Sequence, residues 1–248
     1  MNPDFNTLIY SLEAINLQEL DAVSLLNRVD KKFTLPISRL FELEECLKQN
    51  YRILEIDSNR AFQYENNYFD TPDLDFYKDH HNGYANRVKV RCRKYVESGL
   101  TYFEIKRKEK INRTNKYREQ TSNMIVSLGE NRKNKLSDFT RNNTEDVALI
   151  LKNNFTRITL VDYNLTERVT IDSNIVFINE DQEIKMNDVA VVEIKQSKTS
   201  QNSPLIQFLK QKSIREQSFS KYVFGIISLM PNVKKNNFLA IIKNINNI

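Results

Sequence analysis

The sequence predicts an α+β fold in which an antiparallel β-sheet closes on itself as a barrel, with helices packed outside it. At least eight segments alternate charged and apolar residues with the period of two that is typical of a strand. Other segments have the helical spacing of apolar residues needed to cover the outer faces. Closing the sheet would remove its edges and turn the charged faces toward an interior.

The clearest strand pattern lies in residues 87–118, where two turn signals, Ser98-Gly99 and Ile111-Asn112, separate three segments. In the first segment the apolar residues Val88, Val90 and Cys92 alternate with cations, so one face carries only positive charge. Like charges opposite one another destabilise strand pairing, so this face requires solvent or a polyanion. The cations of the three segments are Arg87, Lys89, Arg91, Arg93, Lys106, Lys108, Lys116 and Arg118.

The other elements follow from the same patterns. Strands are predicted over residues 28–35, 51–57, 61–69, 157–163, 168–172, 175–178 and 191–195. Helices are predicted over residues 5–26, as one or two short pieces, over 38–50, after Ser203-Pro204, from near Ser218, and over 235–248. The polar residues 121–152 are predicted to be a helical excursion outside the sheet. We interpret the chain as one domain, 1–248, with a core at about 28–225, N-terminal helices in 1–26 and a C-terminal helix in 232–248.

The composition and charge of the chain limit the classes of protein to which it can belong. The 248 residues carry 37 Lys and Arg against 32 Asp and Glu, a net charge of +5 that favours anionic partners. The longest apolar run, residues 223–230, is far shorter than a membrane helix, and the N-terminus lacks a signal-peptide pattern. Cys46 and Cys92 have no metal-type spacing and are predicted to be buried, reduced thiols. We therefore expect a cytoplasmic protein.

The positive charge is concentrated on the predicted interior faces. Four carboxylates share those faces with the cations: Asp30, Glu104, Asp172 and Glu193. Enclosure strengthens charge interactions, from ~1 kcal/mol at 4 Å in water to ~4 kcal/mol at an effective dielectric of 20. A compact polyanion such as polyphosphate or a nucleoside triphosphate is therefore the expected ligand. The thirteen cations are Arg28, Lys32, Arg87, Lys89, Arg91, Arg93, Lys106, Lys108, Lys116, Arg118, Arg168, Lys195 and Lys221.

Two other function classes can be weighed from the residues. A nucleic-acid-binding module would use an open basic face and needs no carboxylates within it, so the interspersed Glu residues and the acidic remainder of the chain argue against it. The Gly-x-x-x-x-Gly-Lys phosphate loop does not occur among the four glycines, which excludes a Walker-type ATPase.

Six short charged segments follow one another along the chain. They are Arg91-Cys92-Arg93-Lys94-Tyr95, Glu104-Ile105-Lys106, Lys116-Tyr117-Arg118-Glu119, Arg168-Val169-Thr170-Ile171-Asp172, Glu193-Ile194-Lys195 and Phe219-Ser220-Lys221-Tyr222. In this order they resemble the VTC domain, the polyphosphate polymerase module of the vacuolar transporter chaperone complex and its stand-alone bacterial relatives. The resemblance extends over about residues 28–225, and Lys32-Phe33 and Tyr68-Phe69-Asp70-Thr71-Pro72 resemble the family's first strands.

This resemblance implies the triphosphate tunnel fold of the CYTH-like superfamily, a closed eight-stranded antiparallel barrel. It also implies a transferase that moves the γ-phosphoryl group of ATP onto a polyphosphate chain and releases ADP, with Mn²⁺ or Mg²⁺ as cofactor. The expected ligands are ATP and polyphosphate or pyrophosphate. Translocation of the polymer would require a separate membrane partner.

The resemblance also implies roles for particular residues. Glu193, with Glu104 as a partner, is the expected metal ligand. The residues expected to act on the transferring phosphate are Lys32, Arg91, Arg93, Lys106, Arg168, Lys195 and Lys221. The residues expected to bind substrate are Arg28, Lys89, Lys108, Lys116, Arg118, Tyr163 and Ser220.

The chain departs from the family pattern at two positions. The family usually has Tyr-x-Arg where this chain has Tyr163-Asn164-Leu165, and a Lys where it has Ser218. Arg157 and Arg215 are the candidates to supply the missing charge. A metal-dependent triphosphatase and a non-catalytic polyphosphate or nucleotide binder therefore remain alternatives to the polymerase. Hydrolytic tunnel enzymes have paired glutamates on the first strand, whereas residues 28–32 offer only Asp30.

Overall fold

The computed structural model describes residues 3–21, 28–109, 114–180, 182–197 and 203–248. Its α-helices are α1 (Pro3–Ser11), α2 (Leu17–Asp21), α3 (Glu44–Asn50), α4 (Asp75–His81), α5 (Glu130–Ser137), α6 (Pro204–Gln211), α7 (Lys221–Leu229) and α8 (Leu239–Asn246), with 3-10 turns at Ile37–Leu43 and Asn236–Phe238. Its strands are β1 (Ala14–Ile15), β2 (Arg28–Pro36), β3 (Tyr51–Leu54), β4 (Phe62–Asp70), β5 (Val88–Tyr95), β6 (Thr101–Lys108), β7 (Thr114–Thr121), β8 (Ala148–Asp162), β9 (Glu167–Ile178), β10 (Glu183–Met186) and β11 (Val189–Ser197).

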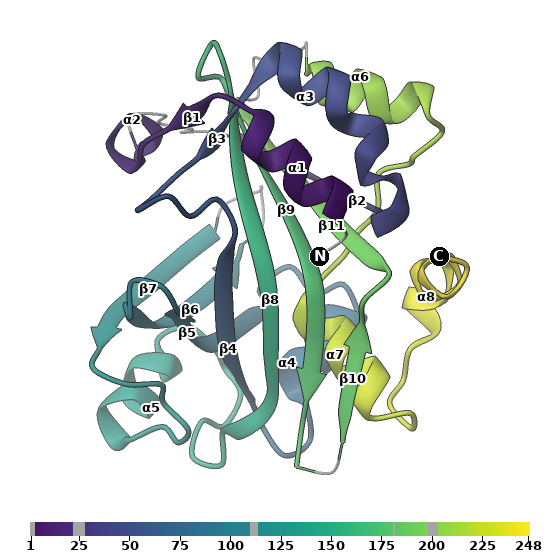
Figure 1. Cartoon of the computed structure of the whole chain (residues 1–248). Coiled ribbons are helices and arrows are strands. Elements are labelled where there is room, and N and C mark those ends of the chain that lie inside the picture. The colour runs from purple at the N-terminus through teal and green to yellow at the C-terminus, as the bar shows by residue number, and fades with distance from the viewer. Residues whose placement is uncertain (1–2, 22–27, 110–113, 181, 198–202) are drawn as a thin grey trace.

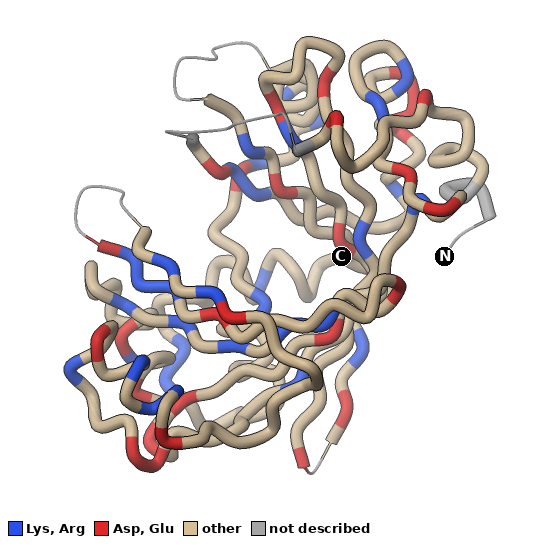
Figure 2. Tube along the Cα trace, turned by 90° about the vertical axis from the view of Figure 1, so that its left-hand side faces the viewer, with Lys and Arg blue, Asp and Glu red and all other residues tan. Residues whose placement is uncertain are grey.

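The strands form one large sheet, which confirms the predicted α+β class. Its main path contains eight strands in the order β2-β11-β9-β8-β4-β5-β6-β7, and each neighbouring pair is antiparallel. Three short strands lie off this path: β10 pairs with β9, β3 pairs with β8, and β1 runs parallel to β3. The sheet is strongly curled, and the two ends of the path stay apart in the chain trace (Figure 2).

The predicted closure of the barrel is wrong: in the described part of the chain β2 and β7 are the two ends of the strand path. The outer edge of β2 is used by another segment. Phe33 forms an isolated bridge with Glu216, and the Gln217 backbone N–H donates to the Lys32 carbonyl at 2.7 Å. The opposite end strand, β7, is largely polar and exposed, as is common for a strand that ends a sheet.

The longest strand, β8, corrects the prediction for residues 121–152. Only Glu130–Ser137 is an α-helix there, and β8 begins at Ala148, well before the predicted start at residue 157. Two polar residues in the middle of the strand, Asn153 and Asn154, concealed the strand pattern. Asn153 is fully buried, and its amide nitrogen donates to the Val176 carbonyl at 2.9 Å, which offsets part of the cost of a polar residue inside the sheet.

Helices cover the outer face of the curled sheet in two places. At one end, α1, α3 and α6 pack against β2, β11, β9 and β8 (Figure 1). This cluster includes Leu47, Leu160, Val192 and Leu209, all fully buried. At the other end, α5 and the loops around it cover β5 and β6, where Cys92 and Phe103 are buried. Cys46 and Cys92 are free and buried, as predicted.

The inner face is apolar at both ends and charged in between. At one end α7 packs on Leu151, Phe155 and Phe177 of β8 and β9. At the other end Ile15 and Leu20, from β1 and α2, pack with Phe62 and Val161 of the same sheet. The charged residues of the inner face therefore lie between two apolar clusters.

The predicted helix start at Ser203-Pro204 is confirmed, whereas the helix predicted from near Ser218 starts later, at Lys221, with Ser220 as its N-cap. The Ser203 hydroxyl accepts from the Ile206 N–H at the start of α6, and the Ser220 hydroxyl accepts from the Val223 N–H at the start of α7. The predicted C-terminal helix is shorter than expected, since α8 spans only Leu239–Asn246. No helix in the described ranges is both long enough and apolar enough to span a membrane.

Close packing under α7 leads to a first testable prediction. A Cβ atom added at Gly225 would lie 2.6 Å from Leu151 Cδ2 and 2.8 Å from Phe177 Cδ1. We expect Gly225→Ala to lower the free energy of unfolding by about 1–2 kcal/mol, because overpacking outweighs the better helix propensity of alanine. Urea denaturation measures this loss. Gly129→Ala is the matched control, since a Cβ there meets nothing within 4 Å, and an equal loss in both variants would contradict the packing argument.

Candidate functional site

Charged side chains from distant strands meet in one cavity on the inner face. The cavity has a volume of roughly 270 Å³. Among the residues that the structure describes, its lining includes eight cations and four carboxylates, a formal excess of four positive charges. The cations are Lys32, Lys89, Arg91, Arg93, Lys106, Arg157, Lys195 and Lys221, and the carboxylates are Asp30, Glu104, Asp172 and Glu193.

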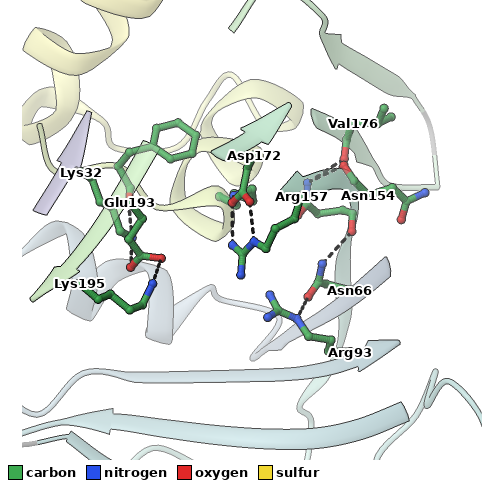
Figure 3. Close-up of polar contacts among 12 residues, drawn as sticks. Lys32, Asn66, Arg93, Asn154, Arg157, Asp172, Val176, Glu193 and Lys195 are labelled. Carbon is green, nitrogen blue, oxygen red and sulfur yellow. Dashed lines mark hydrogen bonds and ion pairs between the residues drawn. The ribbon is translucent and has the colours of Figure 1, made fainter. Parts of the chain in front are cut away.

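Glu193 lies between two lysines on the neighbouring strands β2 and β11. Its Oε2 is 2.6 Å from Lys195 Nζ, and its Oε1 is 3.8 Å from Lys32 Nζ (Figure 3). Register explains this grouping, because Glu193 is directly opposite Lys32, and Lys195 follows two residues later on the same face. Burial alone would raise the pKa of Glu193, but the two lysine charges outweigh it and hold this pKa well below the ordinary value.

Asp172 is the most enclosed carboxylate of the cavity, with a side chain only 3% exposed. Arg157 donates to both of its oxygens, through Nε at 2.6 Å and a terminal nitrogen at 2.7 Å (Figure 3). Lys221 Nζ donates to Oδ2 of the same carboxylate. Burial acts to raise the pKa of Asp172, but these two cations hold it well below the ordinary value. Asp172 therefore joins β8 and β9 to the start of α7.

Two arginines of β5 are also held by specific contacts. Arg91 donates from Nε to Glu104 Oε2 at 2.6 Å. Burial would raise the pKa of Glu104, but the arginine charges outweigh it and lower this pKa to about 2. Arg93 is 8% exposed and donates from Nε to Asn66 Oδ1 at 2.7 Å (Figure 3). The Asn66 amide in turn donates to the Asn153 carbonyl at 3.1 Å. The guanidinium groups are thus oriented before any ligand arrives.

The N-terminus of α7 opens at the same cavity. Lys89 Nζ donates to the Ser220 hydroxyl at 2.8 Å, and Lys32 Nζ donates to the Phe219 carbonyl at 3.0 Å. Ser220, Lys221 and Tyr222 line the cavity, so the free backbone N–H groups of the first turn lie close to it. Such a helix start favours an anion.

Crowding of positive charge lowers the pKa of several lysines here. The pKa of Lys106 falls to about 7, first because of the Arg91 charge and then because of burial. The pKa of Lys221 falls to about 8, first because of burial and also because of Arg157, although Asp172 opposes the shift. The pKa of Lys89 also lies well below its usual value, because the residue is buried beside other cations. An anionic ligand would relieve this repulsion.

The structure brings together ten of the sixteen predicted site residues, and five others with described side chains lie outside the lining of the cavity. Those inside are Lys32, Lys89, Arg91, Arg93, Glu104, Lys106, Glu193, Lys195, Ser220 and Lys221. Of the remainder, Lys108 and Lys116 are exposed, and Arg118 has a half-exposed side chain. The side chain of Arg28 is outside the described residues.

Arg168 and Tyr163 have contacts away from the cavity. Arg168 lies on the same face of β9 as Asp172, but its Nη2 donates to the Leu20 carbonyl of α2 at 2.6 Å. Tyr163 is 45% exposed, and its hydroxyl donates to Glu13 at 3.3 Å. Both residues lie toward the end of the sheet that β1 and α2 cover. Arg168 is directly opposite Lys195 of the cavity, but its guanidinium contacts the backbone of α2 instead.

The alternation pattern did not predict Arg157 as a site residue. The sequence indicates it only as a candidate to supply the charge missing after Tyr163, whereas in the structure it lines the cavity and binds Asp172. The other candidate, Arg215, is exposed and outside the lining. The available signal was the aromatic-x-Arg order of Phe155-Thr156-Arg157.

The carboxylates offer oxygen donors for a metal, but not a complete set. Within the described ranges, no group of three or more His, Cys, Asp or Glu side chains is placed to hold a metal ion. Glu193 and Glu104 each face the cavity and are each paired with cations. Mg²⁺ commonly uses one or two carboxylates together with water and substrate phosphates. The residues present therefore fit a metal whose other ligands come from a bound phosphate chain.

Comparison with solved structures finds several distant likenesses. A candidate adenylate cyclase from Vibrio parahaemolyticus is 10% identical, with a TM-score of 0.47, and the match covers 81% of this chain and 99% of that one. The PH1819 protein of Pyrococcus horikoshii OT3 is 13% identical, with a TM-score of 0.45 and coverage of 81% and 99%. HpAC1 from Hippeastrum, a candidate adenylyl cyclase described as having a dominant triphosphatase activity, is 14% identical, with a TM-score of 0.46 and coverage of 82% and 95%. No curated protein matches the chain.

The sequence itself matches one family over most of its length. The match to the VTC domain extends over residues 27–230, which include β2 to α7 and every residue that lines the cavity. The resemblance drawn from the short motifs is thereby confirmed, and the chain belongs to the VTC domain family.

Proposed function

We propose that this protein is a polyphosphate polymerase that transfers the γ-phosphoryl group of ATP to a growing polyphosphate chain and releases ADP. The observation that carries this proposal is the convergence of eight cations, from five strands and the start of α7, on one cavity. Membership of the VTC domain family supports the same activity. A basic face open to solvent would carry positive charge but would not enclose a ligand.

The charge distribution favours linked phosphates as the ligand. A formal excess of four positive charges in a cavity of roughly 270 Å³ is unfavourable without an anion, because charge interactions are several times stronger there than in water. A triphosphate has a comparable number of negative charges within a few ångströms. Its binding would therefore relieve the repulsion that lowers the pKa values of Lys106 and Lys221.

The transfer step needs alignment and charge neutralisation more than covalent help. A terminal oxygen of the polyphosphate chain attacks the γ-phosphorus of ATP, the bond from that phosphorus to the β,γ-bridging oxygen breaks, and ADP leaves. The acceptor oxygen is already anionic, so no general base is required. Arg91, Arg93 and Arg157 are oriented by Glu104, Asn66 and Asp172, respectively, and are suited to bind phosphate oxygens through planar guanidinium groups.

A divalent cation, Mn²⁺ or Mg²⁺, belongs to this proposal. Glu193 is the residue that would hold it, with Glu104 as a further oxygen donor, and phosphate oxygens would complete the coordination. When bound, the ion would neutralise charge on the transferring phosphoryl group. The lysines beside Glu193 keep its carboxylate ionised, since they hold its pKa low.

A product assay tests the proposal directly. Purified protein is incubated with ATP and Mn²⁺, the products are separated on a gel stained for polyphosphate, and ADP is measured in parallel. We expect long polymer together with ADP. Orthophosphate and ADP without polymer would identify a triphosphatase instead, and the absence of any product with intact ATP binding would identify a non-catalytic binder.

Binding of inorganic tripolyphosphate should depend on pH through Lys221. This ammonium faces Asp172 of β9, Arg157 of β8 and Lys32 of β2, and its pKa of about 8 lies well below the ordinary value of about 10.4. Above pH 8 it must take up a proton when the anion binds. The affinity is therefore expected to fall as pH rises from about 7.5 to about 9.5, by up to about tenfold per pH unit for each proton taken up.

Lys221→Arg is the matched control for this pH dependence, because arginine stays charged throughout the range. We expect it to reduce the slope of log Kd against pH by about one unit. Isothermal titration calorimetry at several pH values measures both slopes. An affinity that rises with pH, or equal slopes in the two proteins, would contradict the assignment of Lys221.

A further inference from the structure

Beside the cavity lies a group of aromatic rings that the polymerase proposal does not use. Tyr64, Tyr95 and Tyr102 belong to β4, β5 and β6. The ring centroids of Tyr64 and Tyr95 are 5.0 Å apart, and those of Tyr95 and Tyr102 are 6.0 Å apart. Arg118 of β7 completes the group, which we call the rim cluster. All three tyrosines are partly exposed.

Arg118 packs against the aromatic part of the rim cluster. Its guanidinium carbon is 3.6 Å from the centroid of the Tyr102 ring, and Nη2 donates to the Tyr95 hydroxyl at 3.2 Å. Arg118 Nε is 3.6 Å from Glu104 Oε1, and the Arg118 side chain is 48% exposed. The guanidinium is thus held in place on one face while much of the side chain stays accessible.

Two cavity residues join the rim cluster to the phosphate site. Glu104, which contacts Arg118, also pairs with Arg91 inside the cavity. Arg93, which lines the cavity, has its guanidinium carbon 5.1 Å from the centroid of the Tyr64 ring. A ligand whose phosphates contact Arg91 and Arg93 would therefore place whatever is attached to them close to the rim cluster.

We propose that the rim cluster binds the nucleobase of the nucleoside triphosphate whose phosphates occupy the cavity, with the base stacked on the Arg118 guanidinium. This inference rests on the proposed function, because the phosphates anchor the nucleotide. Bases stack well on guanidinium planes and aromatic rings. Stacking uses the π-face that every base presents, so ATP and GTP are expected to bind alike.

The contacts of Arg118 favour a base over a phosphate as its ligand. Its charge is already shared with Glu104, and its guanidinium carbon lies 3.6 Å from the centroid of the Tyr102 ring. A phosphate would compete with Glu104 for the edge of the guanidinium, whereas a base would cover its open face. Arg118 would then recognise the nucleoside and not the triphosphate.

The experiment compares two ligands that share the phosphate chain and differ in the base. Calorimetry without turnover measures the binding of inorganic tripolyphosphate and of the ATP analogue with a β,γ-imido bridge. Arg118→Lys keeps the positive charge of the side chain but removes the planar guanidinium group. We expect the analogue to bind about tenfold more weakly to this variant, while the affinity for tripolyphosphate changes by less than about twofold.

Two further variants make the result specific. Tyr102→Leu removes the ring under Arg118 and should give the same selective loss. Arg132→Lys is the matched control, because Arg132 lies over Phe103 on the opposite face of the same strands and should leave both affinities unchanged. If Arg118→Lys affects neither ligand, or weakens both equally, the base assignment is overturned. If neither ligand binds the unaltered protein, the proposed function fails and this inference fails with it.

Discussion

Glu193→Gln is expected to lower the rate of polymer formation from ATP and Mn²⁺ by roughly 100-fold or more, since electrostatic groups at the transferring phosphate commonly contribute effects of this size. Glutamine keeps the shape of the side chain but removes the charge needed for a metal ligand. The same change removes a carboxylate from Lys195 and Lys32. Binding of tripolyphosphate without metal is therefore expected to be retained or strengthened.

Initial rates of ADP release and calorimetry with tripolyphosphate separate these two effects. Glu183→Gln is the matched control, because Glu183 is exposed on β10 and pairs with Lys185 outside the cavity. It should leave both measurements unchanged. Normal turnover in Glu193→Gln would remove Glu193 from the metal site, and loss of tripolyphosphate binding would indicate a general disruption of the cavity.

Asp172→Asn is expected to give the largest loss of stability, about 3 kcal/mol, because removing one partner of a buried ion pair leaves its counter-ions uncompensated. Here two cations, Arg157 and Lys221, would face each other across an uncharged amide. Added tripolyphosphate should restore part of the lost stability, since its oxygens can replace the carboxylate as partners of both cations.

Urea denaturation with and without tripolyphosphate measures this loss and its recovery. Asp138→Asn is the comparison variant, because Asp138 pairs with Lys135 at an exposed site and should cost less than about 1 kcal/mol. Similar losses of unfolding free energy in the two variants would show that the ion pairs of Asp172 stabilise the fold no more than an exposed ion pair does. Recovery by tripolyphosphate in Asp138→Asn alone would contradict its role beside the ligand.

Much of the sheet followed from local alternation along the chain. Charged and apolar residues alternate in β5, β6, β9 and β11, and such a pattern places a whole set of side chains on one face wherever one face is buried. The cations Arg91, Arg93, Lys106 and Lys195 could therefore be grouped before their strands were known to be neighbours. The same rule failed for the first half of β8, because Asn153 is a polar residue that is buried there. No local pattern reveals its hydrogen bond to the Val176 carbonyl of β9.

The position of a residue on the inner face of the curled sheet depended on tertiary packing, which periodicity alone does not supply. Arg168 and Asp172 share one face of β9, yet Asp172 lies in the cavity and Arg168 reaches the backbone of α2. Lys116 and Lys106 are directly opposite on β7 and β6, yet only Lys106 lines the cavity. The curl of the sheet and the segments packed at its ends make this distinction.

By itself, the sequence determined the α+β class, the family, the face on which each strand carries its charge, and the overall excess of cations on those faces. These properties depend on short-range spacing and on composition. Only the tertiary structure decided that the sheet stays open between β2 and β7, that Arg157 lines the site and binds Asp172, and that Arg118 rests on Tyr102 at its rim. Each of these depends on contacts between residues far apart in the chain, where edge pairing, register and side-chain packing compete.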